Sequence, residues 1–403
     1  MQCDGVPLAE LATRFGTPLY VYSAAAIAGR YREVDDAFHG YPHTLHYALK
    51  ANSTLGIARL LRGLGAAADA NSGGEIDIAL RAGFTPPEIV FTGVGKTGTE
   101  LERAIQLGLR SINAESEGEI HRIDAIASSL GTRARVAVRV NPDIDAQSHP
   151  HISTGLKNNK FGVAIADARD MCLRTRERRG VQIVGLHSHV GSQITQLEPL
   201  RRAARALVDL ASELREAGVA IEHLDIGGGL GVSYEGQQVP TAAEYAASVL
   251  PIVRPSGLDL ILEPGRFLVA EAGVLISRVV DIKPQAGGKL FVIVDAGMTE
   301  LMRPMLYGAY HRIEPLQASD APEVLCDVVG PICETTDTLG KDRRLRRPEV
   351  GDLMVIFDAG AYGSVMASNY NRRLMPAEVL IRDGAATLIK RRQTIDDLVA
   401  LES

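Results

Sequence analysis

The sequence has few cysteines, no long apolar run and no large excess of charge of either sign. Its four cysteines show no CxxC pairing, so we predict reduced thiols, with no disulfide and no zinc site. No predominantly apolar stretch reaches the ~18 residues of a membrane span, so we expect no membrane partner. The 49 acidic and 43 basic residues give a formal charge of −6, which offers no electrostatic reason to expect nucleic acid. The cysteines are Cys3, Cys172, Cys326 and Cys333.

The N-terminus and the composition narrow the class of protein further. Residues 1–5 carry no basic segment followed by an apolar one, so we expect no signal peptide and a cytoplasmic location. Hydrophobic residues make up 46% and charged residues 23%, as in soluble globular proteins and unlike disordered or collagen-like chains. A length of 403 residues predicts two domains, or one large domain with a smaller one. The 40 glycines are abundant, and glycine is needed where backbone turns tightly or approaches a ligand.

Strand-like runs alternate with helical patterns through about residue 266. In the gaps between the runs, Thr99 and Glu102 predict a capping box for a helix that ends at Gly108. Strict alternation predicts a parallel sheet. Eight units favour a closed (β/α)₈ (TIM) barrel over an open doubly wound sheet, because no GxGxxG follows the first strand. The predicted strands span residues 44–50, 65–70, 88–93, 110–115, 135–141, 183–190, 221–229 and 258–266.

After residue 266 the pattern changes to short strand-like runs separated by Gly, Pro and Asp. This pattern predicts an all-β domain, sandwich-like or barrel-like, with helical periodicity only near residues 394–401. Another strand-like run, at 18–22, precedes the barrel and either joins the β domain or caps the barrel. We predict a barrel domain over 25–266 and a β domain over 267–403, with 1–24 joining it. The predicted β-domain strands span residues 273–282, 289–295, 323–329, 352–357 and 376–382.

Polar residues at the C-terminal ends of the barrel strands are candidates for an active site, because barrel sites form on that face. The last two predicted strands run into a GGG turn and into EPGR. Barrels often bind phosphate with these two loops, and glycines let backbone N–H groups reach phosphate oxygens. The glycines alone could be a plain tight turn, but both segments together favour phosphate. The candidates are Lys50, Asp69, Arg139, His189, Gly227 to Gly229, Glu263 and Arg266.

Lys50 ends the first predicted strand, at the mouth of the barrel. Most lysines are solvated surface charges, but a partly desolvated lysine can form a Schiff base. A phosphate site beside such a lysine indicates pyridoxal 5'-phosphate (PLP). Glu263 is then the candidate carboxylate for the pyridine nitrogen, and His189 is the candidate for stacking on the ring. Ser192, in the turn HSHVGS, is a candidate for the phosphate.

Eight stretches of the chain resemble the PLP-dependent decarboxylases of the alanine-racemase-like fold (fold type III), and within them the diaminopimelate decarboxylases. The stretches are long and follow the expected order over nearly the whole chain. The chain departs from the family at Thr335, where serine is usual, and this small change affects little beyond local packing. The stretches are YALKAN (47–52), NPDIDAQSHPHISTGLKNNKFG (141–162), HSHVGSQI, LDIGGGLG, EPGR, VDAGMTELMRPMLYGAYH (294–311), GPICETTD (330–337) and GAYGSVMASNYNRR (360–373).

The resemblance implies a role for each candidate. Lys50 would hold PLP as a Schiff base, His189 would stack on its ring, and Glu263 would pair with the pyridine nitrogen. Asp69 and Arg139 would support Lys50. The phosphate would be surrounded by Ser192, Gly228, Gly229, Gly265 and Tyr362, with Arg266 also near the cofactor. The far carboxylate of the substrate would meet Arg266, Arg303 and Tyr307, its far ammonium group would meet Glu334, and Tyr362 would also touch the substrate.

The resemblance also implies a reaction and an assembly. The reaction is decarboxylation of meso-2,6-diaminopimelate at its D-centre to L-lysine and CO₂, the last step of lysine biosynthesis, with no metal. Cys333 or Lys50 would return a proton to the α-carbon, and the residues leave this choice open. The active sites would lie at a homodimer interface, with Cys333 and Glu334 supplied by the partner subunit. The segment from His149 to Gly162 would be a loop near the entrance.

Other interpretations of the same residues stay open. Arg303 and Tyr307 lie four residues apart, as on a solvated helix face, Cys333 could be a buried apolar residue, and Tyr362 could lie in the β core. Another decarboxylase of this group would act on ornithine, lysine, a D-amino acid or carboxynorspermidine. Arg303 and Glu334 argue against ornithine, which lacks a distal carboxylate for guanidinium to bind, but leave open a substrate with a modified distal end. Glu263 argues against a racemase of this fold, and the second domain argues against a single-barrel PLP carrier.

Overall fold

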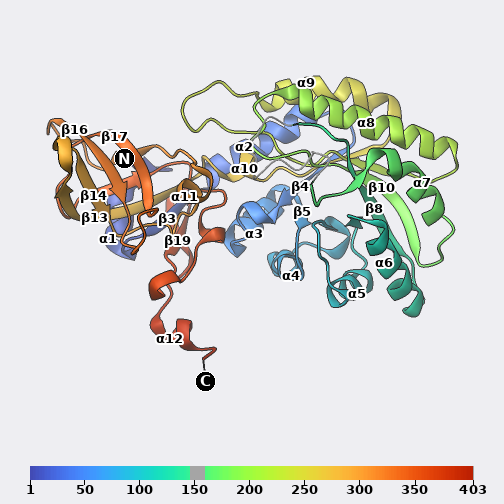
Figure 1. Ribbon diagram of the computed structural model, residues 1–403, viewed down its shortest axis with the longest axis horizontal. Coiled ribbons are helices and arrows are strands. Elements are labelled where there is room, and N and C mark those ends of the chain that lie inside the picture. The colour runs from blue at the N-terminus through green and yellow to red at the C-terminus, as the bar shows by residue number, and fades with distance from the viewer. Residues whose placement is uncertain (146–158, 403) are drawn as a thin grey trace. The chain divides into compact units, whose positions relative to one another are not determined.

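The computed structural model describes residues 1–145 and 159–402 and separates the chain into two compact units (Figure 1). We call them the barrel unit and the β unit. The short segment 233–237 belongs to the β unit although barrel segments flank it, and no shift in composition marks it. Among the described residues, no helix is long and apolar enough to cross a membrane. The barrel unit comprises residues 30–232 and 238–267, and the β unit comprises 1–29, 233–237 and 268–403.

The barrel unit contains eight parallel strands that close into a ring. They follow one another in chain order, and β10 pairs with β8 while β12 pairs with β4, which completes the closure. A two-residue strand, β9 (Val163–Ala164), adds to β8 outside the ring. The predicted (β/α)₈ barrel is confirmed. Its strands are β4 (His43–Ala48), β5 (Ala67–Ala70), β6 (Ile89–Phe91), β7 (Ser111–Ala114), β8 (Ala134–Asn141), β10 (Val181–His187), β11 (His223–Asp225) and β12 (Asp259–Leu262).

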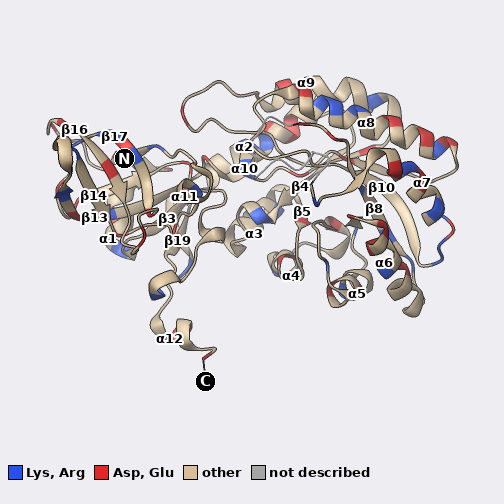
Figure 2. Ribbon diagram, viewed as in Figure 1, with Lys and Arg blue, Asp and Glu red and all other residues tan. Residues whose placement is uncertain are grey.

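The barrel forms because its strands are buried on both faces and its helices on one. Every residue of β5, β6, β7 and β11 is buried, as expected of parallel strands enclosed by helices. The long helix α8 (Leu197–Glu216) buries a stripe that includes Leu200, Leu207 and Leu214, and Figure 2 shows charged residues of both signs along it. The other helices wholly within the barrel unit are α3 (Leu55–Leu64), α4 (Gly73–Ala82), α5 (Gly98–Leu107), α6 (Glu117–Ser129), α7 (Ile165–Thr175) and α9 (Ala242–Val253). Helices α2 (Ala24–Phe38) and α10 (Arg266–Val269) each lie partly in the β unit.

The β unit is built on a mixed sheet with the strand order β17-β16-β14-β13-β3-β19-β20. Strand β3, from the N-terminal part of the chain, lies between β13 and β19. Strand β18 pairs with β13 and β15. The strands are β3 (Leu19–Ser23), β13 (Gly273–Pro284), β14 (Leu290–Val294), β15 (Ile313–Pro315), β16 (Glu323–Val329), β17 (Thr338–Arg346), β18 (Leu353–Ile356), β19 (Ala377–Arg382) and β20 (Ala385–Lys390).

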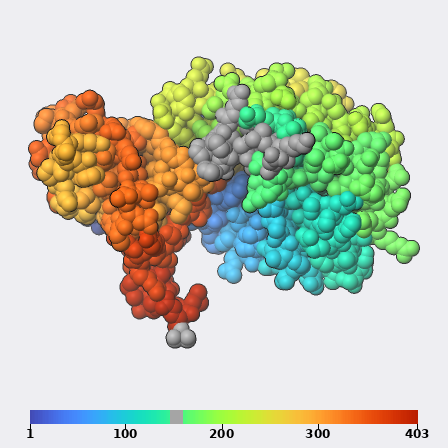
Figure 3. All heavy atoms as spheres, in the orientation of Figure 1, coloured from blue at the N-terminus to red at the C-terminus, as the bar shows by residue number. Residues whose placement is uncertain are grey.

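Smaller elements complete the β unit. A hairpin of β1 (Gln2–Cys3) and β2 (Val6–Pro7) leads into α1 (Leu8–Phe15), whose buried face joins a core with β3 and β19. Helix α11 (Arg303–Tyr307) follows β14. The predicted helical segment at 394–401 contains α12 (Ile395–Val399), which lies in the C-terminal segment that projects from the rest of the unit in Figure 3.

The capping box of α5 lies two residues earlier than the sequence predicts. The Thr97 hydroxyl accepts a hydrogen bond from the Glu100 backbone N–H at 3.3 Å, and Glu100 accepts one from the Thr97 N–H at 2.9 Å. The predicted box at Thr99 and Glu102 is wrong. The same spacing occurs at both places, but Thr97 has the extended backbone (φ −75°, ψ 161°) that an N-cap requires, and Thr99 already lies inside the helix.

Substituting each threonine in turn tests which of the two capping boxes stabilises α5. We expect Thr97→Ala to lower the free energy of unfolding by about 1 kcal/mol, because it removes the acceptor for an N-terminal N–H of α5. Thr99→Ala, a matched change at an exposed helical position, should alter it by less than about 0.5 kcal/mol. Urea denaturation measures both, and an equal loss in the two variants would contradict the assignment.

Candidate active site

Lys50 and Asp69 meet at the C-terminal ends of two neighbouring barrel strands. Lys50 lies in the short 3₁₀ turn Leu49–Ala51 directly after β4, and Asp69 lies in β5. The Lys50 Nζ atom is 3.3 Å from Asp69 Oδ2, and the lysine side chain is one-third exposed (33%) while the aspartate is buried. Burial raises the pKa of Asp69, and the Lys50 ammonium opposes this rise. The pair therefore holds a reachable amine at the mouth of the barrel, as the sequence predicts.

Glu263 lies directly after β12, where it is buried among polar groups from other strand ends. Its Oε2 atom is 3.2 Å from His187 Nε2, and its Oε1 atom accepts a hydrogen bond from the Thr92 hydroxyl at 3.4 Å. Burial by itself would raise the pKa of Glu263, but the His187 ring and the Lys50 ammonium together lower it below its usual range. Glu263 is thus an anionic carboxylate inside a largely apolar barrel.

Sequence reasoning missed three groups around Glu263. His187 and Asp225 are the last residues of β10 and β11, and Thr92 follows β6. His187 stands in the same HSHVGS turn as His189, and Asp225 directly precedes the glycine turn. The available signal was therefore a polar residue at the end of a strand, the criterion that selected the other candidates.

His189 is held as a neutral ring. Its Nδ1 atom accepts a hydrogen bond from the Gly228 backbone N–H at 3.2 Å, so the hydrogen of the neutral ring is on Nε2. Desolvation lowers the pKa of His189 well below its usual value, and the Lys50 and Arg139 charges lower it further. A neutral imidazole suits the predicted stacking role, because a protonated ring would place a second buried cation beside Lys50.

The three glycines after β11 are required by close packing between loops. A Cβ atom at Gly228 would lie 2.1 Å from the Glu263 carbonyl oxygen, and one at Gly229, where φ is +111°, would lie 2.5 Å from the Gly191 oxygen. The N–H groups of Gly227 and Gly228 are donated to Asp225 and to His189. Approach of a phosphate is therefore not needed to explain these glycines.

Ser192, Arg266 and Arg139 lie in the barrel unit with defined partners. Arg266 begins α10 and donates to the Ser192 hydroxyl at 3.0 Å, which joins two predicted residues from separate loops. Arg139, in β8, forms a buried ion pair with Glu115 at 2.6 Å and packs over the Phe161 ring. Arg139 acts on His189 through its charge, and its direct ion pair is with Glu115.

In the β unit, Arg303 is a buried arginine on α11. His311 Nδ1 donates to the Phe357 carbonyl oxygen at 2.8 Å, which leaves Nε2 to accept from Arg303 Nη1 at 2.7 Å. The guanidinium also packs over the Tyr234 ring, 4.7 Å from its centroid. Arg303 is 5% exposed, so the alternative of a solvated helix face does not hold for it. Sequence reasoning did not select His311 or Tyr234.

Cys333 and Glu334 lie in an exposed turn that a buried aspartate organises. Asp337 accepts hydrogen bonds from the backbone N–H groups of Ile332 and Met298, at 2.7 and 2.6 Å. Cys333 is exposed, so the alternative of a buried apolar residue is wrong, and it accepts a hydrogen bond from the Asn371 amide. The turn therefore presents a thiol and a carboxylate on the surface of the β unit.

Tyr362 and the remaining predicted positions complete the β unit's contribution. Tyr362 has φ of +55°, a left-handed conformation that costs a non-glycine residue about 1 kcal/mol or more and often occurs at functional sites. It is partly buried, and Tyr307 lies on α11 with Arg303. The predicted entrance loop falls largely on residues 149–158, which lie outside the described residues. All four cysteines are free.

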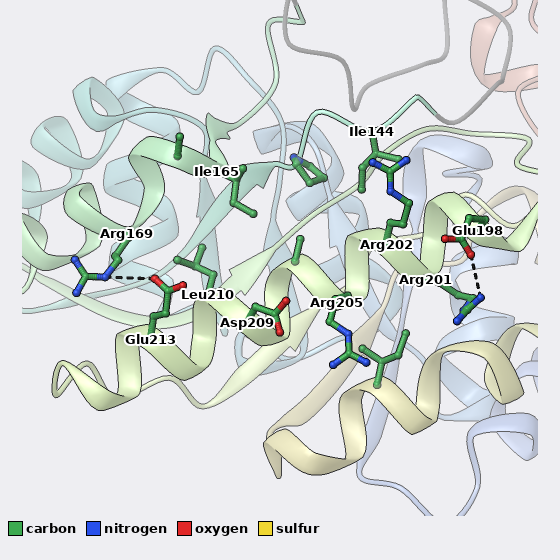
Figure 4. Close-up of a pocket in the computed structure, with 14 residues that line it drawn as sticks. Ile144, Ile165, Arg169, Glu198, Arg201, Arg202, Arg205, Asp209, Leu210 and Glu213 are labelled. Carbon is green, nitrogen blue, oxygen red and sulfur yellow. Dashed lines mark hydrogen bonds and ion pairs between the residues drawn. The ribbon is translucent and has the colours of Figure 1, made fainter.

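A separate cavity of about 700 Å³ lies on the outer surface of the barrel unit, along α7 and α8 (Figure 4). Two of its arginines are paired, Arg169 with Glu213 and Arg201 with Glu198. Its other arginines are exposed on α8, as is usual for a solvated helix face. None of the predicted site residues lines it.

The groups at the barrel mouth fit PLP. They include a reachable lysine amine, a carboxylate kept anionic and a neutral imidazole, which are the groups that its aldehyde, pyridine nitrogen and ring require. The Ser192 hydroxyl and the Arg266 guanidinium add donors suited to a phosphate. Among the described residues, His187, Asp225 and Glu263 form one cluster with spacing that would also suit a metal ion.

Comparisons with known proteins agree with this chemistry. The family described as "Pyridoxal-dependent decarboxylase, pyridoxal binding domain" matches residues 24–270. The chain is 47% identical over 400 residues to a diaminopimelate decarboxylase of Pseudomonas aeruginosa, covering 99% of this chain and 96% of that one. It is 45% identical to the Neisseria meningitidis enzyme of the same name, covering 99% and 98%. The crystal structure of Helicobacter pylori diaminopimelate decarboxylase complexed with L-lysine matches with a TM-score of 0.95 and 43% identity, covering 98% and 99%.

The free energy of unfolding can be measured to test whether His311 supports Arg303. We expect His311→Phe, which keeps an aromatic ring, to lower the free energy of unfolding by about 1.5–3 kcal/mol, because a buried guanidinium loses an acceptor. His39→Phe, at an exposed position, should have little effect. Chemical denaturation of the two variants measures the difference, and wild-type stability of His311→Phe would show that Arg303 does not depend on His311.

Proposed function

The chain belongs to the diaminopimelate decarboxylases, within the pyridoxal-dependent decarboxylases, and we propose that it converts meso-2,6-diaminopimelate to L-lysine and CO₂ by decarboxylation at the D-centre. The observation that carries the proposal is the barrel mouth, where the Lys50 amine and the anionic Glu263 carboxylate lie on the same face. Identity of 47% over 99% of the chain supports the choice of substrate, as does the L-lysine in the Helicobacter pylori structure.

Lys50 would hold the cofactor, and Glu263 would set the charge of its pyridine nitrogen. PLP supplies an electron sink for the pair of electrons left at the α-carbon when CO₂ departs. Glu263 would keep the pyridine nitrogen protonated, since its own carboxylate remains anionic in the barrel. His189 would stack on the ring as a neutral imidazole, and Asp69 would hold the Lys50 amine at the mouth through their 3.3 Å contact.

The phosphate would be held by hydroxyl and guanidinium donors and by backbone. Ser192 and Arg266 lie together at 3.0 Å, and the glycine turn brings backbone close to both the His189 and the Glu263 loops. Arg139 would support the site through its charge and its pair with Glu115. The residues proposed for the phosphate are Ser192, Gly228, Gly229, Gly265, Arg266 and Tyr362.

Recognition of the far end of the substrate would depend on residues of the β unit. Arg303 is already oriented by His311, so a distal carboxylate would meet a guanidinium of defined direction. Tyr307 and Tyr362 would line the same subsite of the β unit. Glu334, exposed on its turn, would meet the distal ammonium group. This combination of opposite charges favours a substrate with a distal amino acid group over one that ends in an amine alone.

We also propose a homodimer with active sites at its interface, in which Cys333 and Glu334 serve the partner's barrel. Both residues are exposed on a turn held by Asp337, as residues that reach another subunit must be. The projecting C-terminal segment exposes Ile395 and Leu401, apolar side chains that a partner would cover. The proton returned to the α-carbon would come from the Cys333 thiol or the Lys50 amine.

We propose that residues 25–266 bind the cofactor. Residues 267–403, with 1–24, would serve substrate recognition and assembly. The two compact units support this division. A cytoplasmic location is proposed with it. The proposed partners are the small-molecule substrate and a second copy of the chain, with no nucleic acid and no membrane.

The central prediction concerns Lys50. Purified protein supplied with PLP and meso-diaminopimelate should release CO₂ and L-lysine, and Lys50→Ala should lower the rate by about 10³-fold or more, because the covalent attachment point is lost. Borohydride reduction of the loaded protein should label the peptide that contains Lys50. Lys283→Ala, an exposed lysine on β13, is the control. No turnover by the wild type, or label on another lysine, would refute the assignment.

The shared active site predicts complementation between two inactive chains. A mixture of Lys50→Ala and Glu334→Ala chains, after subunit exchange, should recover up to about a quarter of wild-type activity, since each hybrid dimer has one intact site. The matched control replaces the second chain by a Lys50→Ala/Glu334→Ala double variant, which leaves no intact site in any dimer. No recovery despite exchange measured by mass spectrometry would show that each site is built from one chain.

A further inference from the structure

Three buried titratable side chains meet at the ends of three adjacent strands of the barrel. His187 ends β10, Asp225 ends β11, and Glu263 follows β12. His187 and Asp225 are direct partners in the parallel register of β10 and β11. One ligand atom from each residue lies within 4.8 Å of the others, and none of the three residues is more than 3% exposed. Two carboxyl groups therefore share a space with almost no water.

Two carboxylates this close cannot both be ionised without a large cost, so one of them holds a proton. Burial raises the pKa of Asp225 well above its usual value, and the charge of Glu263 raises it further. For Glu263 burial also raises the pKa, but the His187 ring and the Lys50 ammonium together lower it below its usual range. Asp69, also nearby, carries a negative charge that adds to the rise at Asp225. The proton thus belongs on Asp225.

The hydrogen bonds lead to the same conclusion. Asp225 Oδ1 accepts from the Gly227 backbone N–H at 2.9 Å, whereas Oδ2 has no donor among the described residues. A buried carboxylate oxygen without a donor is costly. If Oδ2 carries a proton, it becomes the donor of the hydrogen bond between Asp225 and Glu263, and the unsatisfied atom is accounted for.

We propose that Asp225 is a positioning residue that, as a neutral carboxylic acid, donates a hydrogen bond to Glu263 and together with His187 fixes the direction and the charge of that carboxylate. The inference rests on the proposed function only in assigning Glu263 to the pyridine nitrogen. Asp225 also ties Glu263 to the glycine turn, because its other oxygen binds Gly227 and the Gly227 carbonyl accepts the Glu263 N–H at 2.9 Å. One acid therefore links the sites proposed for the ring nitrogen and for the phosphate.

Two substitutions at Asp225 separate a neutral acid from a charged one. Asp225→Asn can accept from Gly227 with its oxygen and donate to Glu263 with its amide, as the protonated acid does. Asp225→Leu has a similar volume and can do neither. We expect Asp225→Asn to keep the Kd for PLP within about threefold of wild type and to preserve the absorption maximum of bound PLP. Asp225→Leu should weaken PLP binding about tenfold or more and shift that maximum, because Glu263 loses a donor.

Infrared spectroscopy tests the proton itself, without PLP. The difference spectrum between wild-type protein and Asp225→Asn should contain a carboxylic acid C=O band at neutral pH. This measurement shows whether Asp225 is protonated even if Asp225→Leu does not fold. Absence of this band, or equal loss of PLP affinity in both variants, would overturn the proposal. So would a stoichiometric divalent cation in the wild type that Asp225→Asn loses. A wild type that does not bind PLP would refute the proposed function instead, while the infrared band would still report on Asp225.

Discussion

The chemistry proposed for the barrel unit depends on keeping one buried carboxylate charged where almost no water reaches it. Glu263 is buried beside two other acids, Asp69 and Asp225, and an isolated ionised carboxylate would be very unstable there. His187 and Thr92 supply hydrogen bonds that favour the Glu263 anion. The proton is carried by Asp225 instead of Glu263. Every residue in this arrangement comes from the end of a parallel strand or the loop after it. Closure of the eight-stranded ring is therefore the condition for the electrostatics of the site.

In the β unit, buried charged side chains are also held in fixed orientations by hydrogen-bond partners. Arg303 is almost fully buried, with His311 as an acceptor and the Tyr234 ring against its face. Asp337 is buried with backbone N–H groups as donors, which leaves Cys333 and Glu334 exposed on a defined turn. In both places a buried polar group, His311 or Asp337, supports the group to which a function is proposed.

Much of the fold could be predicted because buried parallel strands are apolar runs that end in polar residues. Each of the eight predicted strand segments overlaps a barrel strand, and strand ends also marked Lys50, His189 and Glu263. Strand β17 was not predicted, because its sequence TLGKDRRLR is polar and it lies at the edge of the sheet, where charged side chains face solvent. The capping box of α5 was misplaced because two threonines share one spacing and only backbone geometry separates them.

The sequence by itself determined the order of strands and helices, the candidate groups at the strand ends and the family, because these follow from local patterns and long motifs. Only the tertiary structure decided how those groups are paired and charged. The proton on Asp225, the tautomer of His189 and the support of Arg303 by His311 each depend on atoms from segments far apart in the chain. Burial and hydrogen bonding set such states, and both are properties of the folded neighbourhood, which no single segment contains.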